Sequence, residues 1–400
     1  VLQYLPPAEA RARREVNRGT AFLTGVLEPC RRKHNAIAFK GQCVPFAAAK
    51  IRNALDALFD EPYDGPIVTN QRLYERLTLG ISLPQAVAGD TKSFNLKYVD
   101  WEHPERNVFQ VTEEFEVERR GSHQTRRPDL VCFVNGIPFA IIECKRPDLV
   151  TKTGEKGVDQ AVSQMLRNQH LDEIPDLFIY SQLLLGVSEN AALYATTGTD
   201  KKFWAVWEEE EGGGLLPRLA NTPLTPEQED RLYDWRDNAE EVRDYFTSSL
   251  SVPPDGGEEK GGNRLVTPQD RTLYALLRPE RLLELASRFI VYDAGTKKIA
   301  RYQQYFAVKA TLDRVAHLDA RGRRNGGVIW HTTGSGKSLT MVMLAKGLAL
   351  HPNLRNPRLV IVTDPVDLAL QTWHTLKARG KQAATAASAN ALGQLPHSCQ

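Results

Sequence analysis

Two acidic residues and a lysine stand at the open end of one short predicted β-hairpin. The segment 126–147 reads RRPDLVCFVNGIPFAIIECKRP; Asp129 precedes the first apolar run, and Glu143 and Lys145 end the second. Strand residues of equal parity share a face, so Glu143 and Lys145 point the same way. Two neighbouring carboxylates suit a hard divalent cation such as Mg²⁺, which together with an ammonium can activate water against a phosphate. The spacing indicates metal-dependent phosphodiester hydrolysis.

Whether Asp129 shares that face depends on the connection between the two strands. A two-residue Asn-Gly turn would place Asp129 opposite Ile142, on the face away from Glu143. Either a three-residue loop with Gly136 in the left-handed region or a β-bulge near Pro138 restores the shared face. Of the two, we expect the odd loop.

A glutamine follows on the next predicted helix. Residues 155–169 carry one apolar stripe, and Gln164 lies on its flank, from where its amide could hydrogen-bond into the same pocket. The alternative is an exposed hairpin end with solvated charges, because a bare Asp…Glu-x-Lys spacing often occurs by chance. Two features argue against that alternative: an apolar strand places each acid at its end, and Arg126-Arg127 comes directly before.

A glycine-rich loop forms the second candidate site. The segment 328–341, VIWHTTGSGKSLTM, predicts a buried strand, a loop and then a helix. Glycines let the backbone wrap a phosphate, Lys337 would reach the β- and γ-phosphates, and the Ser338 hydroxyl would hold Mg²⁺. His331 stands where the general P-loop pattern has glycine. The residues that we expect to bind ATP here are Thr333, Gly334, Ser335, Gly336, Lys337 and Ser338.

Composition excludes several classes of protein. With 42% hydrophobic and 25% charged residues, the 400-residue chain reads as a soluble globular protein of two or three domains. Its apolar runs are too short to cross a bilayer, and the net charge of +2 gives no strong global field. Five cysteines without metal-ligand spacing fit a reducing compartment, so we expect a cytoplasmic protein. The start at Val1 and the Ala/Ser-rich end suggest a fragment.

Basic residues cluster locally and are usually solvated, unless they lie beside a site that binds phosphate. The clusters are Arg11/Arg13/Arg14, Arg31-Arg32-Lys33, Arg126-Arg127 and Arg321/Arg323/Arg324.

The pattern of elements is α/β. Residues 1–90 read as mostly helical, including a helix at 44–59, and strands are predicted from about 93 to 143. A capping-box pattern, Thr225 with Gln228, opens a later helix. The order strand, helix, strand near the second motif predicts a parallel sheet. Further strands are predicted at 176–181, 183–188, 191–197, 203–207, 327–331 and 359–364.

Both candidate sites, in this order, resemble the R (restriction and motor) subunit of type I restriction enzymes. The segment 126–147 looks like that family's PD-(D/E)xK nuclease signature, with Asp129, Glu143 and Lys145 at the catalytic positions. Gln164 matches the family's glutamine, although Asn168 stands where tyrosine is common. The resemblance covers roughly residues 70–378.

The motor motifs extend the resemblance. IARYQQYFAV, 299–308, is similar to the stretch before the helicase core, where Gln304 would read adenine. The segment 328–341 looks like the motor's P-loop, in which His331 is normal. VIVTDPVDLALQ, 360–371, resembles the next helicase motif, with Pro365 in place of the usual arginine.

The resemblance implies a fold and a division of the chain. A PD-(D/E)xK restriction-endonuclease-like domain, a mixed sheet flanked by helices, would precede the first part of a RecA-like P-loop domain with a parallel sheet. We expect a helical part at 1–90, the nuclease core with following elements at 91–252, a linker at 253–263, and an incomplete first motor lobe at 264–400. The linker PPDGGEEKGGN has no apolar residue.

The resemblance also implies an activity and partners. The protein would be an ATP-dependent endonuclease using Mg²⁺ and ATP, with a superfamily 2 motor that translocates double-stranded DNA. Its partners would be a modification (methyltransferase) subunit, which binds S-adenosylmethionine, and a specificity subunit. No Asp-Glu-x-His or similar run follows Ser338, so we expect the chain to lack the acidic motor motif. Two alternatives remain open: a stand-alone helicase–nuclease of DNA repair, and a non-catalytic DNA-binding remnant.

Overall fold

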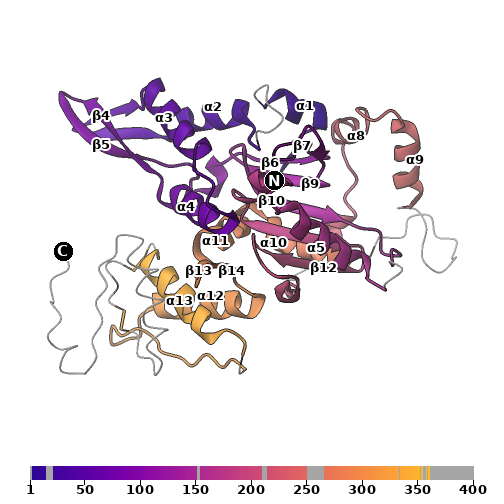
Figure 1. The fold of residues 1–400 in the computed structure, drawn as a ribbon. Helices are drawn as coiled ribbons and strands as arrows, with labels where there is room; N and C mark the ends of the chain where they lie inside the picture. The colour runs from indigo at the N-terminus through magenta and orange to yellow at the C-terminus, as the bar shows by residue number, and fades with distance from the viewer. Residues whose placement is uncertain are drawn as a thin grey trace. The chain divides into compact units, whose positions relative to one another are not determined.

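The chain forms two compact units. The computed structural model describes residues 2–14, 21–150, 154–209, 214–249, 265–332 and 334–351, with 353, 354, 357, 359 and 360 (Figure 1). Contacts between residues group the chain into Val1–Leu283 and Glu284–Gln400. The predicted linker, 253–263, lies outside the described residues. No helix in the described ranges combines the length and apolar character needed to cross a membrane.

A mixed six-stranded sheet organises the first unit. Its order is β1-β6-β9-β10-β11-β12, with β1 parallel to β6, β10 parallel to β11, and the remaining neighbours antiparallel. The mixed sheet flanked by helices agrees with the α/β expectation. The strands are β1 (Gln3–Tyr4), β6 (Phe109–Glu113), β9 (Leu130–Val134), β10 (Ile137–Cys144), β11 (Leu183–Ser188) and β12 (Ala191–Ala195).

Helix α5 (Gly157–Asn168) provides the crossover that parallel strands need, and it packs on both β10 and β11. Its apolar stripe is buried against the sheet, as the periodicity of 155–169 predicts. Gly186 on β11 permits this close packing, since a Cβ there would lie 3.2 Å from the Ala161 side chain. The first turn of α5 therefore starts beside the end of β10.

The first ninety residues contain β-ribbons as well as helices, which corrects the mostly helical expectation. Two hairpins occur there: β2 (Ala36–Phe39) with β3 (Gln42–Pro45), and β4 (Ile81–Val87) with β5 (Asp90–Leu96). Both turn through two residues of positive φ, at Lys40-Gly41 and at Ala88-Gly89. The helix predicted at 44–59 begins later, at Ala48, because β3 extends to Pro45.

The remaining elements of the first unit are mainly helices. The capping box at Thr225 and Gln228 is present at the start of α8, as predicted. The other elements are α1 (Pro7–Ala12), α2 (Thr24–His34), α3 (Ala48–Phe59), α4 (Pro66–Leu79), β7 (Val117–Glu118), β8 (Thr125–Arg126), α6 (Pro175–Phe178), α7 (Leu215–Ala220), α8 (Pro226–Tyr233), α9 (Ala239–Ser249) and α10 (Pro268–Leu277), with 3₁₀ turns at Pro104–Arg106 and Lys201–Phe203.

Two predicted strands of this unit are wrong. Residues 176–181 begin inside α6, where Pro175 occupies the first helical position that suits its fixed φ. Residues 203–207 form only a bridge between Ala205 and Tyr194, not a strand. Short apolar runs fit either a strand or a buried turn, and the periodicity of six residues cannot separate the two.

Residues 265–283 pack with the first unit rather than with the second. Helix α10 contacts α7 and β12, and its Ala275, Leu276 and Leu277 side chains are buried. Helix α11 (Pro279–Arg288) begins in the first unit, where Arg281 forms an ion pair with Glu209 at 2.9 Å. The contact boundary at 283/284 therefore lies after the start of the predicted lobe at residue 264.

The described part of the second unit is a hairpin and two long helices. The hairpin joins β13 (Ile290–Asp293) to β14 (Thr296–Ile299), and α12 (Tyr302–Ala316) packs on α13 (Lys337–Ala349). The buried Lys346 ammonium donates to the Ile290 carbonyl at 2.9 Å, which ties α13 to the hairpin.

The strand predicted at 327–331 is wrong for the described residues. This segment has no strand partner among them, and the Val328 and Trp330 side chains are 91% and 89% exposed. An apolar strand of a parallel sheet needs hydrogen-bonding neighbours on both sides. The predicted neighbour, 359–364, is described only at 359 and 360, neither of which is a strand; the rest lies outside the described residues.

Gly136 offers a stability test of the central hairpin. We expect Gly136→Ala to lower the free energy of unfolding by about 1–2 kcal/mol for the left-handed backbone alone. Overlap adds to this cost, since a Cβ would lie 2.5 Å from the Leu23 carbonyl. Gly89→Ala is the matched control: its φ of +84° resembles the +80° of Gly136, but its Cβ would meet nothing within 4 Å. Urea unfolding curves measure both, and equal losses would contradict the packing argument.

Candidate functional site

The central hairpin brings Asp129 and Glu143 to the same face by means of a bulge. The turn contains two residues, Asn135 and Gly136, both with positive φ, so the expected three-residue loop is wrong. The register then shifts between Pro138 and Ala140, which leaves Phe139 as the extra residue. Beyond this bulge Ile142 pairs with Leu130, and the next pair in the same register is Glu143 with Asp129.

Lys145 lies between the two carboxylates. Its Nζ is 2.6 Å from Glu143 Oε1 and 4.0 Å from Asp129 Oδ2. The same Asp129 Oδ2 accepts a hydrogen bond of 2.6 Å from the Cys144 amide. Three side chains that the sequence places at the two strand ends therefore converge on one point at the open end of the hairpin.

Glu143 is held in an unusual state for a carboxyl group. Its side chain is 1% exposed, and burial together with the nearby charge of Asp129 raises its pKa to about 7. Its second oxygen, Oε2, is buried and accepts no hydrogen bond from the described residues. A buried acceptor without a donor is costly, so this oxygen is suited to bind a cation.

The backbone amide of Cys144 also contributes to the site, and no sequence motif reveals it. A backbone donor has no side-chain signature, and its role depends on the bulge that turns Asp129 towards it. Gly157 at the start of α5 is another such contributor. A Cβ there would lie 2.6 Å from the Arg146 carbonyl and 3.3 Å from Lys145 Cβ, so only glycine lets the helix approach this closely.

Gln164 is not joined to the other three. It is half-buried on α5, and within the described residues it makes no hydrogen bond to Asp129, Glu143 or Lys145. It lies seven residues, or about two helical turns, after Gly157. Its role at the site stays a prediction.

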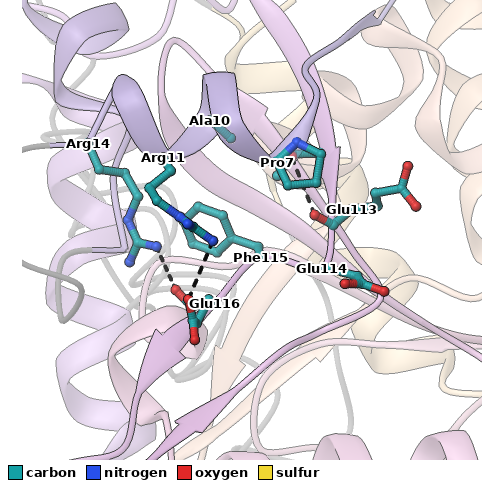
Figure 2. Close-up of a pocket in the computed structure, with 9 residues that line it drawn as sticks. Pro7, Ala10, Arg11, Arg14, Glu113, Glu114, Phe115 and Glu116 are labelled. Carbon is teal, nitrogen blue, oxygen red and sulfur yellow. Dashed lines mark hydrogen bonds and ion pairs between the residues drawn. The ribbon is translucent and has the colours of Figure 1, made fainter. Parts of the chain in front are cut away.

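The arginines near the hairpin already have partners within the chain. Arg126 binds Glu173 through two hydrogen bonds of 2.7 and 2.8 Å, and Arg127 lies 3.4 Å from Glu116. Figure 2 shows Arg11 and Arg14 reaching that same Glu116 across a small pocket beneath α1. Arg126, Arg127, Arg11 and Arg14 are therefore engaged in contacts within the chain.

The glycine-rich loop has the backbone that its sequence predicts. Gly334 and Gly336 have φ of +81° and +84°, and α13 begins directly afterwards at Lys337. The free amides of a first helical turn favour anions. Ser335 lies in the loop and Ser338 in the first turn of α13. Thr333 lies outside the described residues.

The Gln304 side chain holds the glycine-rich loop through hydrogen bonds to its backbone. It is 3% exposed, and its Nε2 donates to the Ser335 and Gly336 carbonyls at 3.3 and 3.1 Å. Its Oε1 accepts from the Arg301 amide at 2.9 Å. Both ends of the amide are therefore engaged with the backbone, and the predicted contact with adenine stays a prediction.

Cysteine-based sites have no support in the described residues. Cys30, Cys43, Cys132 and Cys144 are free thiols, and no group of three or more His, Cys, Asp or Glu side chains there could hold a metal ion. A metal at the hairpin would therefore have two side-chain carboxylates from the protein, with further oxygen ligands from the backbone, water or substrate. Mg²⁺ is commonly bound in this way in phosphate chemistry.

Two family models match the chain. The family model described as type I restriction enzyme R protein N terminus matches residues 6–210, and the SWI2/SNF2 ATPase model matches residues 303–398. The first contains the hairpin and α5, and the second contains the glycine-rich loop.

Curated relatives carry matching names. The type I restriction enzyme HindI endonuclease subunit of Haemophilus influenzae is 28% identical over 315 residues, 77% of this chain and 25% of the relative. The putative type I restriction enzyme MjaIXP endonuclease subunit of Methanocaldococcus jannaschii is 30% identical over 327 residues, 80% of this chain and 28% of the relative. The chain spans about a quarter of the length of these relatives. Since the R-protein model covers half of the sequence, the chain belongs to the type I restriction enzyme R protein family.

Proposed function

We propose that this chain carries the nuclease centre and the nucleotide-binding loop of an ATP-dependent type I restriction endonuclease. The enzyme would hydrolyse phosphodiester bonds of double-stranded DNA and couple this to ATP-driven translocation. The observation that supports it best is the bulge at Phe139, which aligns Asp129 with Glu143 and so brings Lys145 between two carboxylates. A solvated hairpin end has no need of a register shift or of a carboxylate that is 1% exposed.

Asp129 and Glu143 would hold Mg²⁺. The fit rests on the buried Glu143 Oε2, an acceptor without a donor, and on an all-oxygen donor set. When bound, Mg²⁺ supplies a Lewis acid for the phosphate and lowers the pKa of water. The chain itself fixes the Asp129 carboxylate through the Cys144 amide. The Lys145 ammonium is positioned to neutralise charge that develops on the phosphate.

The second unit would bind ATP. Lys337 and the backbone amides of residues 334–338 would cradle the phosphates, and Ser338 would contribute a hydroxyl to Mg²⁺. Gln304 supports the loop backbone from its buried position. The modification and specificity subunits, double-stranded DNA and a cytoplasmic setting are also part of this proposal, and membership of the type I restriction enzyme R protein family supports them.

The direct test of the activity is Mg²⁺-dependent cleavage of supercoiled plasmid. We expect Asp129→Asn to abolish cleavage in an R protein of full family length that contains this chain, because the charge that would bind the metal is lost. Asp148→Asn is the matched control, since Asp148 is exposed and its one ion pair among the described residues is with Arg146. If Asp129→Asn cleaves as fast as Asp148→Asn, the nuclease centre is misassigned and the DNA-binding remnant becomes the better interpretation.

The pH profile of cleavage provides a second prediction. Because the Glu143 pKa is raised to about 7, the carboxyl is mostly protonated at pH 6 and mostly ionised at pH 8. Only the ionised form holds a cation, so the cleavage rate at sub-saturating Mg²⁺ should rise about tenfold over this range. Raising the Mg²⁺ concentration should move the midpoint to lower pH, since metal and proton compete. A midpoint independent of Mg²⁺ would show that another group controls the profile.

A further inference from the structure

Two β-ribbons of the first unit form a single arm, which we define as residues 36–55 and 81–96. The Phe39 and Phe94 rings meet edge to face at 5.7 Å between centroids and join the ribbons. The Gln85 side chain joins them again, because it accepts from the Ala47 amide at 2.8 Å and donates to the Pro45 carbonyl at 3.1 Å. The β4–β5 ribbon extends away from the six-stranded sheet (Figure 1).

The sequence that builds the arm is basic and free of acids over a long stretch. No aspartate or glutamate occurs from residue 29 to residue 55. The same stretch contains Arg31, Arg32, Lys33, Lys40, Lys50 and Arg52. Over the arm itself the acids are limited to Asp90, which pairs with Lys40 at the ribbon tips. The arm therefore contains four basic residues and one acid.

Three cations of the arm have no acidic partner. Lys50, Arg52 and Lys92 form no ion pair with any described residue, in contrast to the arginines beside the nuclease hairpin, which are all engaged. The Lys92 ammonium lies 4.8 Å from the centroid of the Phe39 ring, and this contact fixes its position on the ribbon. Cations without an acidic partner attract a polyanion.

The outward face of the β4–β5 ribbon carries small, uncharged side chains. Pairing places Ser82, Pro84 and Ala86 on that face, opposite Asn95, Ser93 and Thr91, and all six are exposed. Within residues 36–55 and 81–96 no large apolar side chain is exposed. Interfaces between proteins concentrate aromatic and apolar anchors at their centre, whereas interfaces with DNA are polar and positively charged.

We infer that the arm binds the sugar–phosphate backbone of double-stranded DNA through its cations. Lys50, Arg52 and Lys92 would contact phosphates. Lys92 pairs with Gln85, so it projects from the ribbon face opposite to Ser82, Pro84 and Ala86. With seven residues per strand the ribbon is about 23 Å long, which is enough to lie along several phosphates of a duplex.

The arm acts at a distance from the nuclease centre. Tyr98 lies just after β5, and its carbonyl accepts a hydrogen bond from the side-chain amide of Asn135. Asn135 lies at the turn end of the central hairpin. Asp129 and Glu143 lie at the opposite, open end. The arm would therefore hold a stretch of duplex away from the scissile bond. This inference rests on the proposed function only in taking duplex DNA as the substrate.

The test compares two double variants of the full chain that each remove two positive charges. Arg52→Gln with Lys92→Gln changes the arm, and Lys202→Gln with Arg218→Gln changes exposed cations elsewhere in the first unit. Binding to a fluorescein-labelled 30-base-pair duplex is followed by anisotropy over a range of salt concentrations, without divalent metal. The arm variant should bind more weakly, with a log–log salt slope shallower by about 1.8, since each lost phosphate contact contributes about 0.9. The control should match the wild type.

Two outcomes would overturn the inference. One is an arm variant that has the wild-type melting temperature together with wild-type affinity and slope. The other is unchanged DNA binding with loss of assembly with a modification or specificity subunit, which would assign the arm to a protein partner. The anisotropy assay contains no divalent metal and measures no cleavage. A failure of the nuclease assignment in the cleavage assays would therefore leave the result for the arm intact.

Discussion

We expect Lys145→Ala to abolish DNA cleavage while ATP hydrolysis continues at the wild-type rate. The Lys145 ammonium lies 2.6 Å from one carboxylate and 4.0 Å from the other, where a scissile phosphate would bind. Its loss removes the stabilisation of charge that develops on the phosphate, an effect that contributes about 10²–10³-fold in rate. The nucleotide loop lies in the other compact unit, so its chemistry should be unaffected.

The measurement uses an R protein of full family length that contains this chain, with plasmid cleavage and phosphate release followed in the same samples. Lys156→Ala is the matched control, because Lys156 is an exposed lysine at the start of α5 that has no ion pair among the described residues. Should ATP hydrolysis disappear together with cleavage, the two units do not act independently. Should cleavage persist, Lys145 has no catalytic role.

The second large effect concerns ATP. We expect the 400-residue chain to bind ATP weakly and not to turn it over, with or without DNA. Residues 334–338 with Lys337 can cradle phosphates, but hydrolysis also needs acidic groups for Mg²⁺ and an arginine finger, which alone contributes about 10³–10⁵-fold. After Ser338 the acids are Asp364 and Asp367, which are not adjacent.

Phosphate release by the purified chain, beside an R protein of full family length, checks this prediction. Lys337→Ala serves as the control for binding through the loop. DNA-stimulated turnover by the 400-residue chain that is lost in Lys337→Ala would show that the catalytic groups of the motor lie within this sequence after all.

The nuclease hairpin shows how far the sequence predicts which strand residues share a face of the sheet. Alternation along the strands shows that a two-residue turn alone would separate Asp129 from Glu143, and that a bulge near Pro138 would reunite them. The structure contains that bulge, at Phe139, together with the two-residue turn. The choice between loop and bulge depends on tertiary contacts, such as the Phe139 carbonyl accepting from the Gln182 amide at 2.8 Å, which no local pattern records.

The sequence does not reveal the two ribbons of the arm, because their turns lack the usual first residue. The turns are Lys40-Gly41 and Ala88-Gly89, both with positive φ, yet neither begins with the Asn, Asp or Gly that marks such turns in a sequence. Only the central hairpin carries the recognisable Asn-Gly pair. Lysine and alanine tolerate the left-handed region here because the paired strands fix the register on either side.

The nucleotide loop shows the opposite limit. Its glycines and the start of α13 are local features, and the sequence predicts them correctly. The contact of Gln304 with the Ser335 and Gly336 carbonyls joins positions more than thirty residues apart, so spacing alone cannot reveal it. The strand predicted at 327–331 depends on neighbours in the same way, and no described residue pairs with it.

The central claim is that Asp129 and Glu143 hold one divalent cation. Anomalous diffraction from crystals of the chain soaked in Mn²⁺, a stand-in for Mg²⁺, tests it most directly. We predict a peak within bonding distance of Asp129 and of Glu143 Oε2, which is absent from crystals of Glu143→Gln prepared in the same way. Wild-type crystals with no peak at the hairpin, or with a peak that the substitution leaves unchanged, would contradict the account.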